Sequence, residues 1–278
     1  MQSPIESIRA AAEKLPNTTF VNVNHSALPH LEQPNQRYLD RFTSSLHSAR
    51  QVPNIWYASQ DDVAVSVGIA AGITRCCHLP LPARVLTPRP PREPNTPANI
   101  VIAGRADAIK NNLVHLIACG MLRDSTRLIL CLNPDRMFRN TLHALRLDAD
   151  VRGLLPHDQW IDLLRDEADL VLCCSHAESY CFIAVEAMQI GVPVVSSSAV
   201  RFTPPDQVAP GGTPSAIAET VEYVLSHYPQ CVANGIESAS TSAKQQRSHY
   251  VSQIADLPNE RHGDRQGNQR DGSNDVVY

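Results

Sequence analysis

The feature that most constrains the fold is a repeated alternation of short apolar segments with amphipathic segments between residues 98 and 228. The apolar segments have the length of buried strands, and the segments between them have the spacing of helices. Strands that are apolar on both faces and separated by helices are typical of a parallel sheet covered on both sides. We therefore predict an α/β, doubly wound fold.

The same pattern assigns elements along the whole chain. The expected strands are 19–24, 54–59, 73–79, 98–104, 127–132, 169–174 and 192–197, with a short one near 150–153. The expected helices are 37–49, 61–70, 109–121, 135–147, 158–166, 179–190 and 214–227.

A proline-rich segment divides the chain. Seven of the 21 prolines fall between Pro80 and Pro97, and such a segment is typical of an extended, semi-rigid connector. We therefore predict a first domain at 1–80, a linker at 81–97 and a second domain at 98–236. Residues 237–278 are polar, and we predict a largely disordered tail there because so little apolar surface can be buried.

Composition and charge exclude several classes of protein. Lys and Arg number 24 against 28 Asp and Glu, for a net charge of −4, which lacks the basic excess of a nucleic-acid binder. The first residues carry charges where a signal peptide is apolar, and no apolar run is long enough to span a membrane. We expect a cytoplasmic protein, with peripheral attachment to the inner membrane surface as a further option.

Cysteine usage argues against disulfides and zinc. The eight cysteines include no C-x-x-C pair, and several lie in apolar strand-like runs. Buried thiols in a reducing compartment are the expected state. Adjacent cysteines space ligands poorly around a tetrahedral ion, so we predict no metal site.

Two common nucleotide-binding motifs are missing. No G-x-G-x-x-G connects a strand to a helix, which disfavours a dinucleotide-binding dehydrogenase. The segment GRADAIKN at 104–111 has one glycine and no hydroxyl residue after Lys110, so it is not a P-loop.

The same segment places two cations beside the end of a strand. Arg105 follows the predicted strand 98–104, and Lys110 lies at the start of the next helix. Ligands of open α/β sheets bind at that edge, and two converging cations suit a diphosphate. The alternative is a solvated turn with two surface cations.

Two glutamates belong to the region of the helix predicted at 179–190, one directly before it and one inside it. Ser175 and Glu178 fit a capping box, so Glu178 could be a helix-capping carboxylate. Glu186 lies in a stretch that is apolar on nearly every side, where an unpaired carboxylate is costly to bury. A hydroxyl-rich ligand such as a ribose would satisfy Glu186, and so would an arginine elsewhere in the chain.

The segment from Glu178 to Glu186 resembles the Glu-x7-Glu motif of the retaining GT-B glycosyltransferases of group 1. The resemblance covers residues 98–228, and the chain is identified as a member of that family. Further positions that match the family pattern are Ala187-Met188, Gly191, Pro193-Val194-Val195, Gly104-Arg105, Lys110, Gly153 and Ala168-Asp169.

The resemblance implies two Rossmann-like, doubly wound domains and a role for each matched residue. Arg105 and Lys110 would neutralise the diphosphate of a nucleotide sugar. Glu186 would hold the ribose hydroxyls, and Glu178 would contact the transferred sugar. The amides around Ser179, Tyr180 and Cys181 would face the phosphates, as helix N-termini do for anions. The family needs neither metal nor cofactor for this.

The first domain resembles the family more weakly. His25 follows a strand, as does the histidine that the family places near the sugar, although a capping or surface role is the alternative. Only a short stretch precedes His25, so we expect a truncated acceptor domain. A second departure is Cys181, which stands where the family carries a glycine.

The implied function is transfer of a sugar from a nucleotide sugar to an acceptor hydroxyl with retention, in polysaccharide or glycoconjugate biosynthesis. The acceptor would be a glycan, a lipid-linked molecule or a small molecule. The alternative is a non-catalytic nucleotide-sugar-binding or subunit protein with the same fold. A sugar-phosphate epimerase is a third option, but it needs a second acid–base set that the sequence does not offer.

Overall fold

The computed structural model describes residues 4–24, 36–106 and 108–257, and His25 lies outside them. The chain divides into two compact units. One comprises the residues up to Leu81 together with those from Ser248 onward, and the other comprises Pro82–Arg247. The proline-rich segment therefore groups with the second unit.

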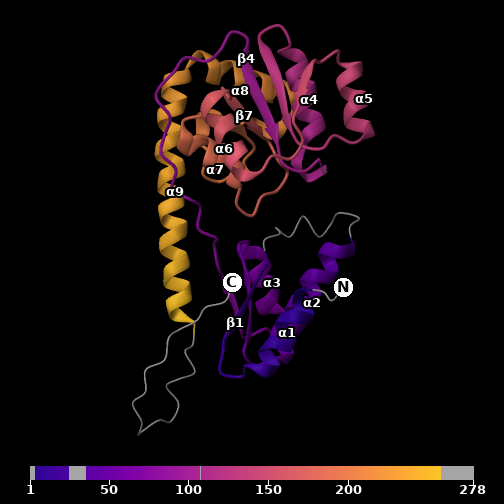
Figure 1. Cartoon of the computed structure of the whole chain (residues 1–278), viewed down its shortest axis with the longest axis vertical. Coiled ribbons are helices and arrows are strands. Elements are labelled where there is room, and N and C mark those ends of the chain that lie inside the picture. Colours follow the sequence, from indigo (N-terminus) through magenta and orange to yellow (C-terminus); the bar gives the residue numbers. More distant parts are fainter. Residues whose placement is uncertain (1–3, 25–35, 107, 258–278) are drawn as a thin grey trace. The chain divides into compact units, whose positions relative to one another are not determined.

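The second unit is built on a five-stranded parallel sheet (Figure 1). Its strand order is β6-β5-β4-β7-β8. From the central β4 the chain adds β5 and β6 on one side, and it then crosses back to add β7 and β8 on the other side. This is the doubly wound arrangement, with its switch point between β4 and β7. The strands are β4 (Ala98–Ala103), β5 (Thr126–Cys131), β6 (Ala149–Val151), β7 (Leu170–Cys173) and β8 (Val194–Ser196).

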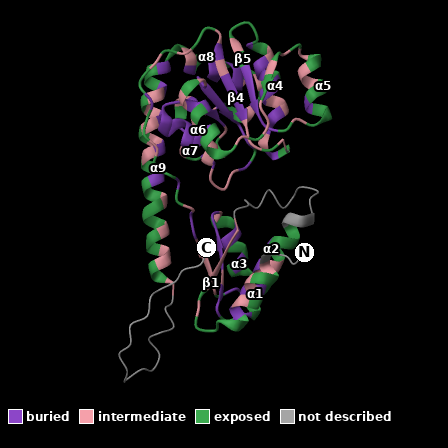
Figure 2. Cartoon of the chain, in the orientation of Figure 1, coloured by how far each residue is buried: buried purple, intermediate pink, exposed green. Residues whose placement is uncertain are grey.

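The two faces of this sheet form two separate cores. Successive residues of β4 alternate between them, because Ile100 and Ile102 pack on one face and Val101 packs on the other. Strands β7 and β8 are buried along their full length. Strand β4 is also mostly buried (Figure 2). The doubly wound α/β class predicted from the apolar runs is thereby confirmed.

Helices cover both faces. The core that contains Ile100 packs against α4 (Asn112–Met121), α5 (Arg136–Ala144) and α8 (Pro214–Ser226). The core that contains Val101 packs against α6 (His157–Asp166), α7 (Phe182–Ile190) and α9 (Tyr228–Asp256). Local sequence fixes several helix ends: Asp135 caps α5, Thr213 caps α8, and Gly191 ends α7 in the left-handed region at φ 94°.

The first unit contains a smaller, three-stranded parallel sheet in the order β1-β2-β3. Its strands are β1 (Phe20–Asn24), β2 (Ile55–Ser59) and β3 (Cys76–His78). The described helices of this unit are α1 (Pro4–Lys14), α2 (Gln36–Gln51), α3 (Asp62–Ala70) and the end of α9 from Ser248 to Asp256. The small sheet agrees with the truncated first domain that the sequence predicts.

Residues 81–97 of the proline-rich segment form neither helix nor strand, and they are docked against the rest of the second unit. The guanidinium of Arg89 is buried and donates to the carbonyl oxygens of Leu164 and Ala168 at 2.9 and 2.8 Å and to the hydroxyl of Tyr228 at 2.9 Å. The side-chain amide of Gln189 in α7 bonds the backbone of the same segment twice. Its oxygen accepts from the amide of Leu86, and its nitrogen donates to the carbonyl of Arg84. Side chains therefore pin this segment to α6, α7 and α9.

The structure differs from the prediction of a largely disordered tail at residues 237–256, which are helical in α9. Gly235, Ala239 and Ala243 are buried and lie four residues apart on one face of that helix. A Cβ added at Gly235 would lie 3.3 Å from Met188 of α7, so only a small residue allows this close packing. Residues 258–278 lie outside the described residues.

All eight cysteines are free thiols. Six of them are buried, and burial raises the pKa of Cys119 and Cys174 to about 12 and that of Cys131 to about 11. Cys76 and Cys77 are half-buried, and burial raises their pKa to about 11.

Candidate functional site

The carboxyl ends of β4 and β7 define the candidate site, because ligands of doubly wound sheets bind at the switch point. The loop after β4 carries Arg105 and Lys110, and the loop after β7 carries Glu178. The two loops are joined by a backbone bond from the amide of His176 to the carbonyl of Ile109 at 2.8 Å.

The loop after β4 turns sharply toward α7. Gly104 has φ 107°, and a Cβ there would lie 3.2 Å from the side chain of Ile183. Arg105 is exposed, and its carbonyl accepts a bond from the side chain of Asn112 at 2.9 Å. Lys110 ends a short 3₁₀ helix (Ala108–Lys110), so α4 begins later than the sequence predicts.

Lys110 and Glu178 form an ion pair. The Nζ atom of Lys110 donates to Oε1 of Glu178 at 2.5 Å, and the exposed fractions of the two side chains are 16% and 7%. Burial by itself would lower the pKa of Lys110, but the charge and hydrogen bond of Glu178, together with the nearby Cys181 and Cys173, outweigh burial and the pKa is raised. Lys110 therefore keeps its positive charge at neutral pH. The fold thus pairs a residue predicted for the diphosphate with one predicted for the sugar.

The capping box considered for Ser175 and Glu178 does not form. Helix α7 begins at Phe182, with Cys181 in the N-cap position, so residues 179–181 lie in the loop and not in the predicted helix. The carboxylate of Glu178 contacts Lys110, and the buried Ser175 lies at the end of β7.

The loop residues before α7 differ in their surroundings. The ring of Tyr180 packs edge-on against Phe182 at a centroid distance of 5.2 Å and also lies 5.2 Å from the ring of Phe202. Its hydroxyl is 3.3 Å from Ser242 of α9, and burial raises its pKa. The Tyr180 side chain is thus part of the core around α9. Ser179 is half-buried in the same loop.

Cys181 and His115 line a small cavity beside the ion pair. The cavity has a volume of about 10 Å³, which accommodates about one water molecule. His115 is buried, and burial lowers its pKa to about 3, so the ring is neutral. Its Nε2 accepts the amide hydrogen of Cys174 at 3.0 Å, which leaves the proton on Nδ1. Among the described residues Nδ1 has no protein partner, and a water in this cavity would satisfy it.

Glu186 is buried within α7 and has two partners from α6. Trp160 donates its indole Nε1 hydrogen to Oε2 at 2.9 Å, and Nε2 of His157 lies 2.9 Å from Oε1. The sequence offered a ligand or an arginine as alternatives. The protein partners of Glu186 among the described residues are a tryptophan and a histidine and not an arginine, and the ribose ligand stays a prediction.

Sequence reasoning missed His157 and Trp160, although a signal was available. They are three residues apart and therefore lie on one face of α6. A tryptophan in an apolar helix face usually needs a partner for its N–H, and a buried glutamate needs donors. Matching these two requirements could have paired Trp160 with Glu186.

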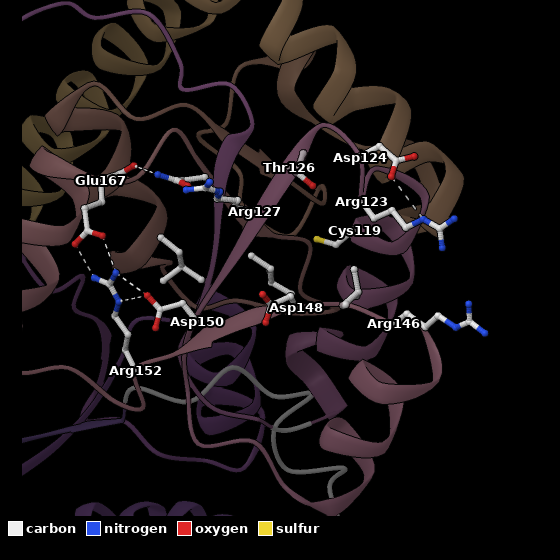
Figure 3. A pocket seen from close by; sticks show the side chains of 14 residues that line it. Cys119, Arg123, Asp124, Thr126, Arg127, Arg146, Asp148, Asp150, Arg152 and Glu167 are labelled. Carbon is white, nitrogen blue, oxygen red and sulfur yellow. Dashed lines mark hydrogen bonds and ion pairs between the residues drawn. The ribbon is translucent and has the colours of Figure 1, made fainter.

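A much larger pocket, of about 670 Å³, lies at the opposite, amino-terminal edge of the sheet (Figure 3). It is lined by charges of both signs from β5, β6 and neighbouring loops. Arg152 bonds Glu167 at 2.6 Å and Asp150 at 2.7 Å. The hydrogen bonds to Arg152 lower the pKa of Glu167. These charges neutralise one another, and the pocket lies away from the switch point.

Neither a metal centre nor a membrane span is present in the described part of the chain. No group of three or more His, Cys, Asp or Glu side chains in it is placed to hold a metal ion. Among the helices of the same residues, none is both long and apolar enough to cross a bilayer.

The doubly wound sheet with a charged pair at its switch point defines an α/β protein with a candidate ligand site at the carboxyl edge. The sequence profile of the family described as glycosyl transferases group 1 matches residues 87–241, more than half of the chain. The chain belongs to this family. The matched region contains the ion pair, Glu186 and both of its partners.

Solved structures share the fold. Anabaena HepE in complex with UDP-glucose has a TM-score of 0.67 at 14% identity, over 91% of this chain and 76% of that one. Sucrose-phosphate synthase from Thermosynechococcus elongatus has a TM-score of 0.62 at 14% identity, over 89% and 71%. The C-terminal domain of the glycosyl transferase group 1 family protein LpcC from Francisella tularensis has a TM-score of 0.50 at 18% identity. The match covers 58% of this chain and 97% of that one. A comparison with curated protein sequences gave no match.

Proposed function

We propose that this protein transfers a sugar from a nucleotide-sugar donor to an acceptor hydroxyl with retention at the anomeric carbon. The observation that carries the proposal is the Lys110–Glu178 pair at the switch point of a group 1 family fold. Such a pair brings a cation for the leaving diphosphate and a carboxylate for the sugar to one place. HepE, which shares the fold, was solved in complex with UDP-glucose, and a nucleotide sugar is the class of donor that we propose here.

In this reaction the bond between the anomeric carbon and the diphosphate oxygen breaks, and negative charge grows on the diphosphate. Lys110 and Arg105 stabilise that charge from the loop after β4, and the backbone amides at the start of α7 add their dipoles. The acceptor oxygen bonds the anomeric carbon, and its proton passes to the diphosphate oxygen that departs.

Glu178 is the proposed contact for the transferred sugar, and Glu186 is the proposed contact for the ribose. Cys181 in the N-cap position and the neighbouring Ser179 and Tyr180 supply backbone amides near the diphosphate. His25 keeps its proposed role near the sugar, as a residue outside those that the structure describes. The acceptor is proposed to be a glycan, a lipid-linked molecule or a small molecule.

Binding of nucleoside diphosphates tests the proposal. ADP, GDP and UDP are each compared with the matching nucleoside by thermal shift, and one of the diphosphates is expected to raise the melting temperature strongly. Saturation at 100 times the dissociation constant corresponds to about 2.7 kcal/mol of added stability. Arg105→Ala should weaken that diphosphate by about 1.5–3 kcal/mol, because a charge-assisted hydrogen bond is lost.

Arg127→Ala is the matched control, because this exposed arginine lies at the amino-terminal edge of the sheet. It should bind the diphosphate as the parent does. Equal affinity of Arg105→Ala and the parent would remove Arg105 from the donor site. If no diphosphate binds better than its nucleoside, the proposed function fails.

A non-catalytic nucleotide-sugar-binding protein is the second candidate, because the described first sheet has three strands. Both candidates bind the donor, but only the enzyme releases nucleoside diphosphate from it in the presence of an acceptor. Release above the rate of a Glu178→Gln control supports the transferase, and stable binding without release supports the binding protein.

Binding and turnover should not depend on a divalent metal. Protein cations and helix dipoles supply the charge stabilisation in the proposed site. Affinity measured in EDTA should therefore equal affinity measured with Mg²⁺ or Mn²⁺. Loss of binding in EDTA that either metal restores would contradict the proposed mechanism.

A further inference from the structure

Glu186 is held by a chain of contacts that reaches the proline-rich segment. Its Oε2 accepts from the indole of Trp160, and its Oε1 lies 2.9 Å from Nε2 of His157. The other ring nitrogen of His157 lies 3.4 Å from Nη1 of Arg84. Glu186 is 7% exposed and Trp160 is likewise buried, whereas the His157 side chain is 40% exposed.

The chemistry of these groups fixes the direction of each hydrogen bond. A carboxylate only accepts, so the hydrogen of the 2.9 Å contact between Nε2 of His157 and Oε1 of Glu186 is on Nε2. Nε2–H therefore donates to the Glu186 carboxylate. Both oxygens of Glu186 receive one proton donor each, from two rings on the same face of α6.

We infer that Trp160 and His157 are positioning residues that orient the Glu186 carboxylate for the ribose hydroxyls of the donor. The inference rests on the proposed function and adds to it two residues that act through Glu186. The terminal torsion of a glutamate is broad, so a carboxylate without such partners rotates. Each carboxylate oxygen still has acceptor capacity after one bond, so it can also accept a hydrogen bond from a ribose hydroxyl.

The orientation of the Glu186 carboxylate can be tested by comparing the affinities of ligands that contain ribose with those of ligands that contain 2′-deoxyribose. Dissociation constants of ADP, GDP and UDP and their 2′-deoxy counterparts are measured by calorimetry, and the tightest pair is used for the variants. The parent should prefer the ribose form by about 10- to 100-fold, because the 2′-hydroxyl donates to a charged acceptor. A change that merely loosens the fold weakens both ligands alike and leaves their ratio unchanged.

The variants separate positioning from structure. Trp160→Phe keeps most of the ring volume but removes the N–H, and His157→Ala removes the other donor. Each should lower the ribose preference by about 3- to 10-fold, the range of one ordinary hydrogen bond. His157→Gln restores an N–H donor and should recover most of the preference. Asp162→Ala, at an exposed position of α6, is the matched control and should keep the parent ratio.

The outcomes are distinct. Loss of the ribose preference in Trp160→Phe and His157→Ala, with recovery in His157→Gln, supports the inference. An unchanged ratio in Trp160→Phe and His157→Ala overturns it, even if both ligands bind more weakly, and so does a parent without ribose preference. If the inference fails in this way but the parent still binds a nucleoside diphosphate, the proposed function is not contradicted. Failure of the parent to bind any nucleoside diphosphate overturns the proposed function itself.

Discussion

Replacing Asp169 by alanine is expected to destabilise the protein by about 3–5 kcal/mol, the usual cost of removing one member of a buried ion pair. Asp169 is fully buried, and its Oδ1 lies 2.7 Å from Nη1 of Arg92. Its Oδ2 accepts hydrogen bonds from the backbone amide and side chain of Asn95 and from the amide of Asn99. Alanine would leave these donors without their acceptor.

Thermal unfolding monitored by circular dichroism measures this effect. For a domain of this size the melting temperature should fall by roughly 6–20 °C. Asp162→Ala, an exposed aspartate on α6, is the control and should change stability by less than about 0.5 kcal/mol. A loss of under about 1 kcal/mol for Asp169→Ala would mean that the network around Arg92 contributes little.

The second large effect concerns the ion pair at the switch point. Lys110→Met should lower the rate of sugar transfer by about 10²–10³-fold, because the departing diphosphate loses a cation. It should also cost about 2–4 kcal/mol of stability, since Glu178 stays largely buried without its partner. Rates of diphosphate release and melting temperatures measure the two effects.

Glu178→Gln separates the two roles of this pair. It keeps the Lys110 cation and removes the negative charge of the carboxylate that this cation bonds, so nucleoside diphosphates should bind as tightly as to the parent or more tightly, while transfer is lost. The variant that carries both Lys110→Met and Glu178→Gln should lose less stability than the two single losses added together. Glu178→Gln removes the charge of the carboxylate that Lys110→Met leaves buried without the cation that it bonds. Weaker diphosphate binding by Glu178→Gln than by Lys110→Met would contradict these roles.

The second sheet could be predicted from the sequence because its strands are buried on both faces. Residues such as Ile100, Val101 and Ile102 are all apolar, although they face two different cores. The doubly wound order then follows from helices that alternate with strands. Helix ends were less predictable: α7 begins at Phe182, because the aromatic ring of Tyr180 packs against Phe202 and the capping pattern at Ser175 is not used.

The prediction of the site was limited by contacts between residues distant in the sequence. Arg105 and Lys110 could be placed at the carboxyl edge because strand ends are local features. That Lys110 meets Glu178, and that Glu186 meets Trp160 and not an arginine, depends on how neighbouring loops and helices pack. Their roles in donor binding and catalysis, and that of His25, stay predictions.

The helix α9 was missed because small residues carry its packing. Hydrophobic patterns give weight to large side chains, but the buried face of this helix contains Gly235, Ala239 and Ala243. The docking of the proline-rich segment was missed for a different reason. The buried guanidinium of Arg89 donates to the backbone carbonyls of Leu164 and Ala168. Every residue has such a carbonyl, so the sequence does not indicate which ones an arginine bonds.

The state of the cysteines has a practical consequence for labelling. Alkylating reagents react with thiolates, and a thiol with a pKa of about 11 or 12 is almost entirely protonated at neutral pH. Cys119, Cys131 and Cys174 are also shielded from solvent. A cysteine introduced at an exposed position such as Asp162 would therefore react with maleimide well before these three. Fluorophores or spin labels can thus be attached without first replacing them.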